Sequence, residues 1–265
     1  MNDSVKPVTL SKLLKAKVKS EKLALLTAYD ASFARLLHQC GVDALLVGDS
    51  LGMVMQGHDS TIPVTLDDVI YHAKMVKRGA PLAWVIADLP FMTATDVVQG
   101  LTSARRLLQE AQVQMVKVEG GLSVLPLVQA LTEQGVPVCA HIGLLPQQAL
   151  RAGYKMAGKT EADAQRLLDE ALALEKAGAS LLVMECVVAE VAQRITSALS
   201  IPTIGIGSGA ETDGQVLVLH DILGLSSYAP SFAPKFLIEG RSLAEAVTAY
   251  VQAVKLGEFP SQVKG

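Results

Sequence analysis

The chain has 265 residues, half of them apolar, with a formal net charge of −3 and a pI near 6. This size and composition predict one domain, residues 1–265, built around a single large core. The lack of a basic excess argues against a nucleic-acid partner, because phosphate contacts require many lysines and arginines.

Eight short aliphatic segments recur along the chain, and a segment with helical spacing of apolar residues follows most of them. This alternation predicts parallel βα units whose strands are covered on both faces. The expected strands span residues 23–30, 43–50, 82–89, 115–120, 136–144, 180–187, 202–209 and 215–223. The expected helices span residues 32–39, 66–78, 94–111, 123–134, 161–177, 188–198 and 242–256, the last with a Ser-x-x-Glu capping box.

Eight units in one domain favour a closed (β/α)8 barrel, the TIM-barrel fold of the α/β class, over an open doubly wound sheet with the same alternation. The stretch between Gly209 and Gln215 leaves no room for a helix, so either the seventh crossover is abbreviated or the last strand is misplaced. Two long connections, residues 51–65 and 145–160, are of the kind that often carries function.

The three cysteines, Cys40, Cys139 and Cys186, form no paired motif, so neither a disulfide framework nor a zinc site is expected. Each lies in an apolar stretch that suits a buried small side chain. The lysine-rich first twenty residues lack the apolar run of a secretory signal, and no stretch reaches the roughly 18 apolar residues of a membrane helix. We therefore expect a cytoplasmic protein with no membrane partner.

Acidic residues end five of the expected strands, at Asp30, Asp49, Asp88, Glu119 and Glu185. In a parallel barrel these ends converge on one mouth, where barrel enzymes have their active sites. So many carboxylates would repel one another unless a cation lay between them. Oxygen-only ligation suits Mg²⁺, with Asp49, Asp88 and Glu119 as ligands, Glu119 either directly or through a water. Asp30 is equally well explained as the N-cap of the next helix.

Glu185 and three further polar residues have expected roles at the same mouth. Lys117 lies two residues before Glu119 and faces the same side of its strand, so it either pairs with an acid or, as we favour, binds a substrate carboxylate or enolate. Glu185 is the expected general base, with helix capping as its alternative. His141 is an alternative base, a hydrogen-bond donor to the substrate or a core histidine. The Ser50 hydroxyl can donate to a substrate carboxylate.

The run Gly205-Ile206-Gly207-Ser208-Gly209 is similar to the phosphate-binding loops of barrel enzymes. It is equally typical of a tight turn with close backbone packing. Neither a complete P-loop nor a GxGxxG fingerprint is present, so the run does not predict a nucleotide site.

Several strings carry a resemblance to a known family: TAYD (27–30), LLVGDSLGMVMQGHDST (45–61), ADLPFM (87–92), VKVEGG (116–121), HIGLLPQ (141–147), MECV (184–187), IGIGSG (204–209) and TDGQVLVLHD (212–221). In this order and spacing, from about Leu10 to near the C-terminus, the chain resembles the ketopantoate hydroxymethyltransferases, which are barrels of the phosphoenolpyruvate/pyruvate superfamily. It departs from the family pattern at Ser208, at Ala210-Glu211 and in residues 226–234, which lack a His-Ile-Pro-Lys sequence.

The resemblance implies transfer of a hydroxymethyl group from 5,10-methylenetetrahydrofolate to 3-methyl-2-oxobutanoate, giving 2-dehydropantoate in the first step of pantothenate biosynthesis. The expected intermediate is an enolate, formed when a base removes the C3 proton and stabilised by Mg²⁺ and a lysine. The resemblance also implies a homo-oligomer, a decamer. The residues it implies are Asp49, Asp88 and Glu119 for the metal, Asp49, Ser50, Asp88 and Lys117 for the keto acid, and Glu185 for the proton; His141 is added to the substrate contacts on chemical grounds.

Two other interpretations stay open on the sequence. One is a lyase of the same superfamily that cleaves a carbon–carbon bond in a substituted malate or citrate. Such lyases commonly place a cysteine-bearing motif at the mouth, a setting that Cys139 and Cys186 lack. The other is a non-catalytic barrel, which would be expected to have lost Glu185, Lys117 or the metal acids, all of which are present.

Overall fold

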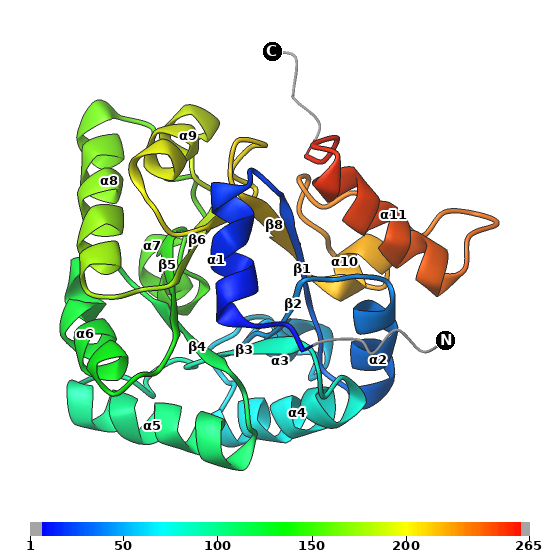
Figure 1. Cartoon of the computed structure of the whole chain (residues 1–265), viewed down its shortest axis with the longest axis horizontal. Helices are drawn as coiled ribbons and strands as arrows, with labels where there is room; N and C mark the ends of the chain where they lie inside the picture. The colour runs from blue at the N-terminus through cyan, green and yellow to red at the C-terminus, as the bar shows by residue number, and fades with distance from the viewer. Residues whose placement is uncertain (1–6, 261–265) are drawn as a thin grey trace.

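The computed structural model describes residues 7–260, and its eight parallel strands close into a barrel in the order β1 to β8 (Figure 1). The strands are β1 (Leu23–Thr27), β2 (Ala44–Val47), β3 (Trp84–Asp88), β4 (Met115–Glu119), β5 (Val138–Gly143), β6 (Leu181–Glu185), β7 (Thr203–Ile206) and β8 (Gly214–Leu217). The helices are α1 (Leu10–Val18), α2 (Ala31–Gln39), α3 (Leu51–Val54), α4 (Leu66–Gly79), α5 (Val97–Glu110), α6 (Leu125–Glu133), α7 (Ala149–Ala152), α8 (Glu161–Lys176), α9 (Ala189–Ala198), α10 (Leu219–Leu223) and α11 (Leu243–Lys255), with short 3-10 turns η1 (Leu122–Val124) and η2 (Pro146–Gln148).

Closure of the sheet is established by β1, which pairs in parallel with both β2 and β8. Leu25 lies opposite Ala44 on one side and Val216 on the other. The expected barrel is therefore confirmed, and the open sheet is wrong. Residues 207–213 join β7 to β8 without a helix, so the seventh crossover is abbreviated. The ends of the expected domain, residues 1–6 and 261–265, lie outside the described part of the chain.

The main correction concerns where the strands end. The observed strands stop before the expected ends because the apolar runs continue into buried connections at the mouth. The last expected strand, residues 215–223, is wrong in its second half, which forms α10. Leu219, Ile222 and Leu223 are buried at helical spacing, and Gly224 ends the helix in the left-handed conformation at φ 67°.

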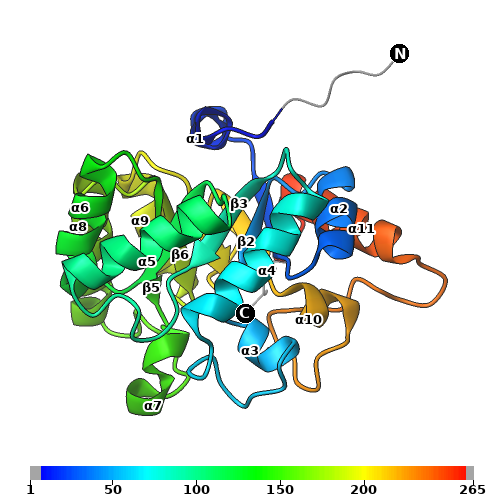
Figure 2. The ribbon, with the colours of Figure 1, turned by 90° about the horizontal axis from the view of Figure 1, so that it is seen from below.

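Helix α1 was not among the expected helices, and it closes one end of the barrel. Its N-cap is Thr9, whose side chain accepts a hydrogen bond from the Lys12 backbone N–H. Leu13 and Ala16 are buried with the inward-facing residues of the strands, such as Leu25. Figure 2 shows α1 across one end of the molecule, with α3, α7 and α10 at the other end. The second end is the mouth, because these three helices follow the C-terminal ends of strands.

Leu13→Asp is expected to destabilise the protein by about 3 kcal/mol or more, because it places an unpaired carboxylate among apolar side chains. Leu13 is 1% exposed. Urea unfolding measures the change, with Val18→Asp as the control, since Val18 lies on the same helix and is 85% exposed. Equal unfolding midpoints for the two variants would show that α1 contributes nothing to the closed end.

The cysteines only partly follow the expectation of burial. Cys139 is buried inside the barrel, whereas Cys40 and Cys186 are half-buried, and all three are free. Cys40 and Cys186 lie at the ends of a helix and a strand, where the apolar pattern of the sequence gives way to a turn. Among residues 7–260, no helix has the length and apolar character needed to cross a bilayer.

Candidate active site

The polar residues of the mouth continue the inward-facing rows of the strands. On β4, Met115 packs in the barrel interior, so Lys117 and Glu119, two and four residues later, face the same interior. The same alternation brings three more residues to this mouth: Asp88 and Glu185, which end β3 and β6, and His141 of β5. Short aliphatic strands thus position a polar cluster above an apolar barrel core.

Three carboxylates come together in this cluster. Asp49, which follows β2, lies beside Asp88 and Glu119, and one oxygen of each falls within 4.8 Å of the other two. The Asp49 backbone N–H donates to Asp88 Oδ2 at 3.0 Å. All three side chains are almost completely withdrawn from solvent. The structure therefore brings together the three acids that the sequence predicted to act as metal ligands.

Lys117 lies between two of these acids. Its Nζ is 2.8 Å from Asp88 Oδ1 and 3.2 Å from Glu119 Oε1. Burial alone would lower the pKa of Lys117, but the charges of Asp88, Glu119 and Asp49 outweigh burial and hold it well above its usual value. The ammonium is therefore charged and paired with acids in this structure, while it remains at the mouth, where a substrate carboxylate would arrive.

The cluster carries more negative charge than Lys117 compensates. Burial and the charges of Glu119 and Asp88 raise the pKa of Asp49 well above its usual value. Glu119 behaves in the opposite way: burial would raise its pKa, but Lys117 and His141 lower it to about 2. A nearly dry site of three carboxylates with excess negative charge fits a hard divalent cation such as Mg²⁺, which prefers oxygen ligands.

His141 connects the cluster to Glu185. Its Nδ1 is 3.3 Å from Glu119 Oε1, and its Nε2 is 3.4 Å from Glu185 Oε2. Burial and Lys117 would lower the pKa of His141, but Glu119 and Glu185 raise it to about 9. A protonated imidazole cannot accept a proton, so the geometry favours Glu185 over His141 as the base. The Glu185 side chain is 18% exposed, which leaves it open to the mouth.

Gln147 is a site residue that the sequence analysis did not single out. Its Nε2 donates to Asp49 Oδ2 at 2.9 Å and to the Leu89 carbonyl at 3.0 Å, and its backbone N–H donates to Glu119 Oε2 at 3.2 Å. It comes from the long connection 145–160, which was expected to carry function, and from the family string HIGLLPQ. These two features of the sequence could have identified Gln147 as a site residue.

Tyr29 was also missed, and it explains the position of Ser50. The Tyr29 hydroxyl lies 2.8 Å from Ser50 Oγ, and Tyr29 is 1% exposed. A side chain at Gly48 would meet both Ser50 Oγ and Asp88 Oδ2, so this glycine allows the serine to lie close to the acids. Asp30 does not join them: it accepts hydrogen bonds from two backbone N–H groups of the first turn of α2, so the N-cap explanation is correct.

The glycine run after β7 is packed against protein, as the tight-turn interpretation predicts. An added Cβ would lie 2.7 Å from the Phe232 ring at Gly207 and 2.7 Å from Ala189 at Gly209. At Gly205 it would lie 2.8 Å from Thr212 Oγ1. These close approaches explain the glycines without an anion.

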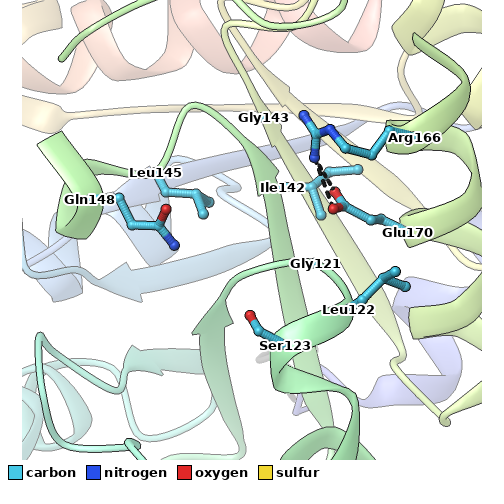
Figure 3. Close-up of a pocket in the computed structure, with 9 residues that line it drawn as sticks. All are labelled: Gly121, Leu122, Ser123, Ile142, Gly143, Leu145, Gln148, Arg166 and Glu170. Carbon is cyan, nitrogen blue, oxygen red and sulfur yellow. Dashed lines mark hydrogen bonds and ion pairs between the residues drawn. The ribbon is translucent and has the colours of Figure 1, made fainter. Parts of the chain in front are cut away.

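A cavity of about 260 Å³ adjoins the mouth (Figure 3). Gly143, at its edge, pairs with Glu185 across β5 and β6. On the far side, the Arg166 guanidinium donates to both carboxylate oxygens of Glu170 at 2.8 and 2.9 Å. The cavity is lined by Gly121, Leu122, Ser123, Ile142, Gly143, Leu145, Gln148, Arg166 and Glu170.

Comparison with known proteins identifies the family. Residues 7–262 match a family model described as Ketopantoate hydroxymethyltransferase. The chain belongs to this family. A curated relative from Idiomarina loihiensis, named 3-methyl-2-oxobutanoate hydroxymethyltransferase, is 54% identical over 255 residues and 96% of each chain. Membership in the ketopantoate hydroxymethyltransferase family makes the chain an enzyme, a transferase of the first step of pantothenate biosynthesis, and the non-catalytic interpretation is wrong.

Solved structures support the fold class. A 2,3-dimethylmalate lyase, described as a member of the PEP mutase/isocitrate lyase superfamily, has a TM-score of 0.53 at 19% identity and covers 78% of this chain and 80% of its own. A phosphonopyruvate hydrolase solved with oxalate and Mg²⁺ has a TM-score of 0.60 at 13% identity, with 79% and 80% covered. At these identities the likeness concerns the fold alone, and it supports the closed (β/α)8 barrel.

Proposed function

We propose that this member of the ketopantoate hydroxymethyltransferase family transfers a hydroxymethyl group from 5,10-methylenetetrahydrofolate to 3-methyl-2-oxobutanoate, giving 2-dehydropantoate. The observation that carries the proposal is the arrangement around His141. Three buried carboxylates with excess negative charge lie on one side, and the solvent-open carboxylate of Glu185 lies on the other. Family membership indicates which reaction the carboxylate cluster and Glu185 together perform.

Asp49, Asp88 and Glu119 are the residues that would hold a divalent ion. When bound, Mg²⁺ supplies Lewis-acid polarisation of the substrate's keto group, which makes the adjacent C3–H acidic. The phosphonopyruvate hydrolase solved with oxalate and Mg²⁺ supports Mg²⁺ as the first ion to test.

Lys117 and Ser50 are the donors available to the keto acid. The Lys117 ammonium is charged and can pair with the substrate carboxylate, or with the oxygen that gains charge as the enolate forms. Ser50 is held by Tyr29 with its hydroxyl beside the acids, where it can donate to the same carboxylate. His141 Nε2 lies 3.4 Å from Glu185 Oε2, where a charged imidazole attracts that carboxylate.

Glu185 removes the C3 proton. The C–H bond breaks, its proton passes to the carboxylate, and its electron pair enters the enolate. C3 of the enolate then forms a carbon–carbon bond with the methylene carbon of the folate, and the two bonds from this carbon to the folate nitrogens break. Water supplies the hydroxyl oxygen of the product. Tetrahydrofolate leaves after its two nitrogens take up protons from solvent, which replace those released by C3 and by the water. A partly open carboxylate suits this step, because it must meet the substrate and later release the proton to solvent.

The cavity of Figure 3 is where we place part of the folate. Its volume of about 260 Å³ is below the roughly 300–1,000 Å³ of sites for drug-sized ligands, so it accepts a portion of the molecule. A carboxylate matches the neighbouring N3–H and 2-amino donors of a pterin ring, and each Glu170 oxygen can accept a further hydrogen bond beside Arg166. Gly143 places this cavity next to Glu185.

Glu170→Gln is expected to raise the KM for 5,10-methylenetetrahydrofolate by about tenfold or more, since a charge-assisted hydrogen bond is lost. Exchange of the keto acid C3 proton, which needs no folate, should stay unchanged. Steady-state kinetics measure both quantities. Asp169→Asn is the control, because Asp169 is the exposed neighbour on α8 and pairs with Gln165. If Glu170→Gln and the control have equal KM values for the folate, the folate does not bind in this cavity.

Product analysis separates the transferase from the superfamily lyase. With 3-methyl-2-oxobutanoate, Mg²⁺ and 5,10-methylenetetrahydrofolate, the enzyme should form 2-dehydropantoate, detected by mass spectrometry, and omission of the folate should abolish it. Folate-independent cleavage of a substituted malate or citrate, with no 2-dehydropantoate formed, would establish the lyase instead.

We also propose that the whole chain, residues 1–265, is one domain and that the enzyme works in the cytoplasm as a homo-oligomer, a decamer. The family resemblance supports these proposals. Sedimentation at micromolar concentration tests the assembly, and a monomer would contradict it.

A further inference from the structure

The backbone immediately after Glu185 adopts an unusual conformation. Cys186 has φ 47°, in the left-handed region that residues other than glycine rarely occupy. Cys186 directly follows Glu185, the last residue of β6, so the turn begins at the peptide bond that joins these two residues. Something in the structure has to hold this conformation.

Backbone hydrogen bonds hold the two residues of the turn from both sides. The Glu185 carbonyl accepts from the Leu144 N–H at 2.8 Å, and the Cys186 N–H donates to the Ile206 carbonyl at 2.9 Å. The Cys186 carbonyl accepts from the Ala157 N–H at 2.8 Å. Met184, just before the turn, is paired in the sheet with Ile142 and Gly205, and Val187, just after it, forms a bridge with Ala157.

The Ser208 hydroxyl adds a side-chain link between these two residues. It donates to the Met184 carbonyl at 2.7 Å and accepts from the Val187 N–H at 3.0 Å. Ser208 is 1% exposed and Val187 is 1% exposed, so water does not easily replace these bonds. One side chain from the loop after β7 therefore bridges the backbone on either side of Glu185 and Cys186.

The loop fixes Ser208 in this position. Gly207 and Gly209 on either side have φ 62° and 81°, and both are packed tightly, against Phe232 and Ala189. The loop is also tied to β8, because Gln215 Nε2 donates to the Gly209 carbonyl at 2.9 Å. The serine hydroxyl consequently lies beneath the turn after β6 with little freedom to move away.

We propose that Ser208 is a positioning residue for the base. Its hydroxyl clamps the left-handed turn at Cys186 and so aims Glu185 at the C3 proton of the substrate. The proposal rests on the proposed function, in which Glu185 removes that proton.

Ser208→Ala is expected to lower kcat for C3 proton exchange in the Mg²⁺-loaded enzyme about tenfold, equivalent to about 1.4 kcal/mol in the barrier. The KM for the keto acid should stay within about twofold, because substrate contacts are untouched. Thr203→Val is the matched control: it removes a fully buried hydroxyl from the other end of β7, where Thr203 Oγ1 pairs with Thr196 and Asp213. It should lower the melting temperature without lowering kcat.

A test in the Cys186→Gly variant distinguishes an effect of Ser208 on the turn from an effect on the stability of the whole protein. Glycine adopts positive φ without strain, so a Cys186→Gly background needs the clamp less. In that background Ser208→Ala should cost less than about threefold in kcat. Ser208→Thr, which keeps the hydroxyl, should retain more activity than Ser208→Ala. An equal loss from Ser208→Ala in both backgrounds would overturn the proposal.

Hydrogen–deuterium exchange at the Val187 amide tests the clamp without catalysis. In Ser208→Ala this amide should exchange more than about tenfold faster than in the wild type, because it loses its acceptor. Unchanged protection would overturn the clamp. If the wild-type enzyme fails to exchange the C3 proton, the proposed function fails, while the amide measurement still decides the clamp.

Discussion

Replacing Glu185 with Gln is expected to lower kcat by about 10²–10⁴-fold, roughly 3–5 kcal/mol of transition-state stabilisation. Glutamine is similar in size and can still contact His141, but it cannot accept the C3 proton. The KM for the keto acid should change little, because Glu185 is not among the proposed substrate contacts, which are Asp49, Ser50, Asp88, Lys117 and His141. Steady-state assays of 2-dehydropantoate formation measure the effect.

The control for this substitution is Glu190→Gln, which makes the same chemical change on the exposed first turn of α9. It should leave kcat unchanged. Metal binding should also survive in Glu185→Gln, since Glu185 lies on the far side of His141 from the carboxylate cluster. Full activity in Glu185→Gln would assign the proton transfer to another group.

Asp88→Asn is expected to weaken binding of Mn²⁺, used as a spectroscopic substitute for Mg²⁺, by more than about 100-fold. Substituting a residue that only hydrogen-bonds to a metal ligand typically lowers metal affinity by about 10–100-fold, and a ligand itself should matter more. The substitution removes one of the three carboxylates, the one nearest to the Lys117 ammonium. Lys117 then neutralises a larger share of the remaining negative charge, so the site attracts a cation less strongly. Electron paramagnetic resonance titration measures the free Mn²⁺ directly and does not depend on activity.

Asp30→Asn is the matched control for this measurement. Asp30 is also an acid at the end of a strand, but it caps α2, and asparagine caps helices about as well as aspartate. Its Mn²⁺ affinity should therefore equal that of the wild type. Equal affinities in Asp88→Asn and Asp30→Asn would mean that the three buried carboxylates do not form the metal site.

The barrel and its acidic mouth could be predicted because both follow from short-range rules. Side chains alternate along a strand, so Met115 in the core places Lys117 and Glu119 at the mouth. Strand ends in a parallel barrel meet at one end, so acids far apart in the sequence were expected to gather. The alternation of side chains could not show at which residue each strand ends. Helix α10 was mistaken for the end of a strand, because a short apolar run fits the periodicity of a strand as well as that of a helix.

The remaining parts of the site depend on long-range contacts that no local pattern encodes. Gln147 reaches Asp49 across 98 residues, and the Tyr29 hydroxyl meets Ser50 from a different strand end. Ser208 contacts Met184 and Val187 from the loop after β7, and its sequence setting indicated only a glycine-rich turn. Helix α1 escaped prediction because its few buried residues are separated by lysines.

Enolisation at this site is tested most directly by exchange of the C3 proton of 3-methyl-2-oxobutanoate in deuterated buffer, followed by NMR without folate. We expect exchange with Mg²⁺, none with EDTA, and a rate reduced by about 10²–10⁴-fold in Glu185→Gln. No exchange with Mg²⁺ in the wild type, or equal exchange with EDTA, would contradict the central claim that a metal-bearing carboxylate cluster and Glu185 together enolise this keto acid.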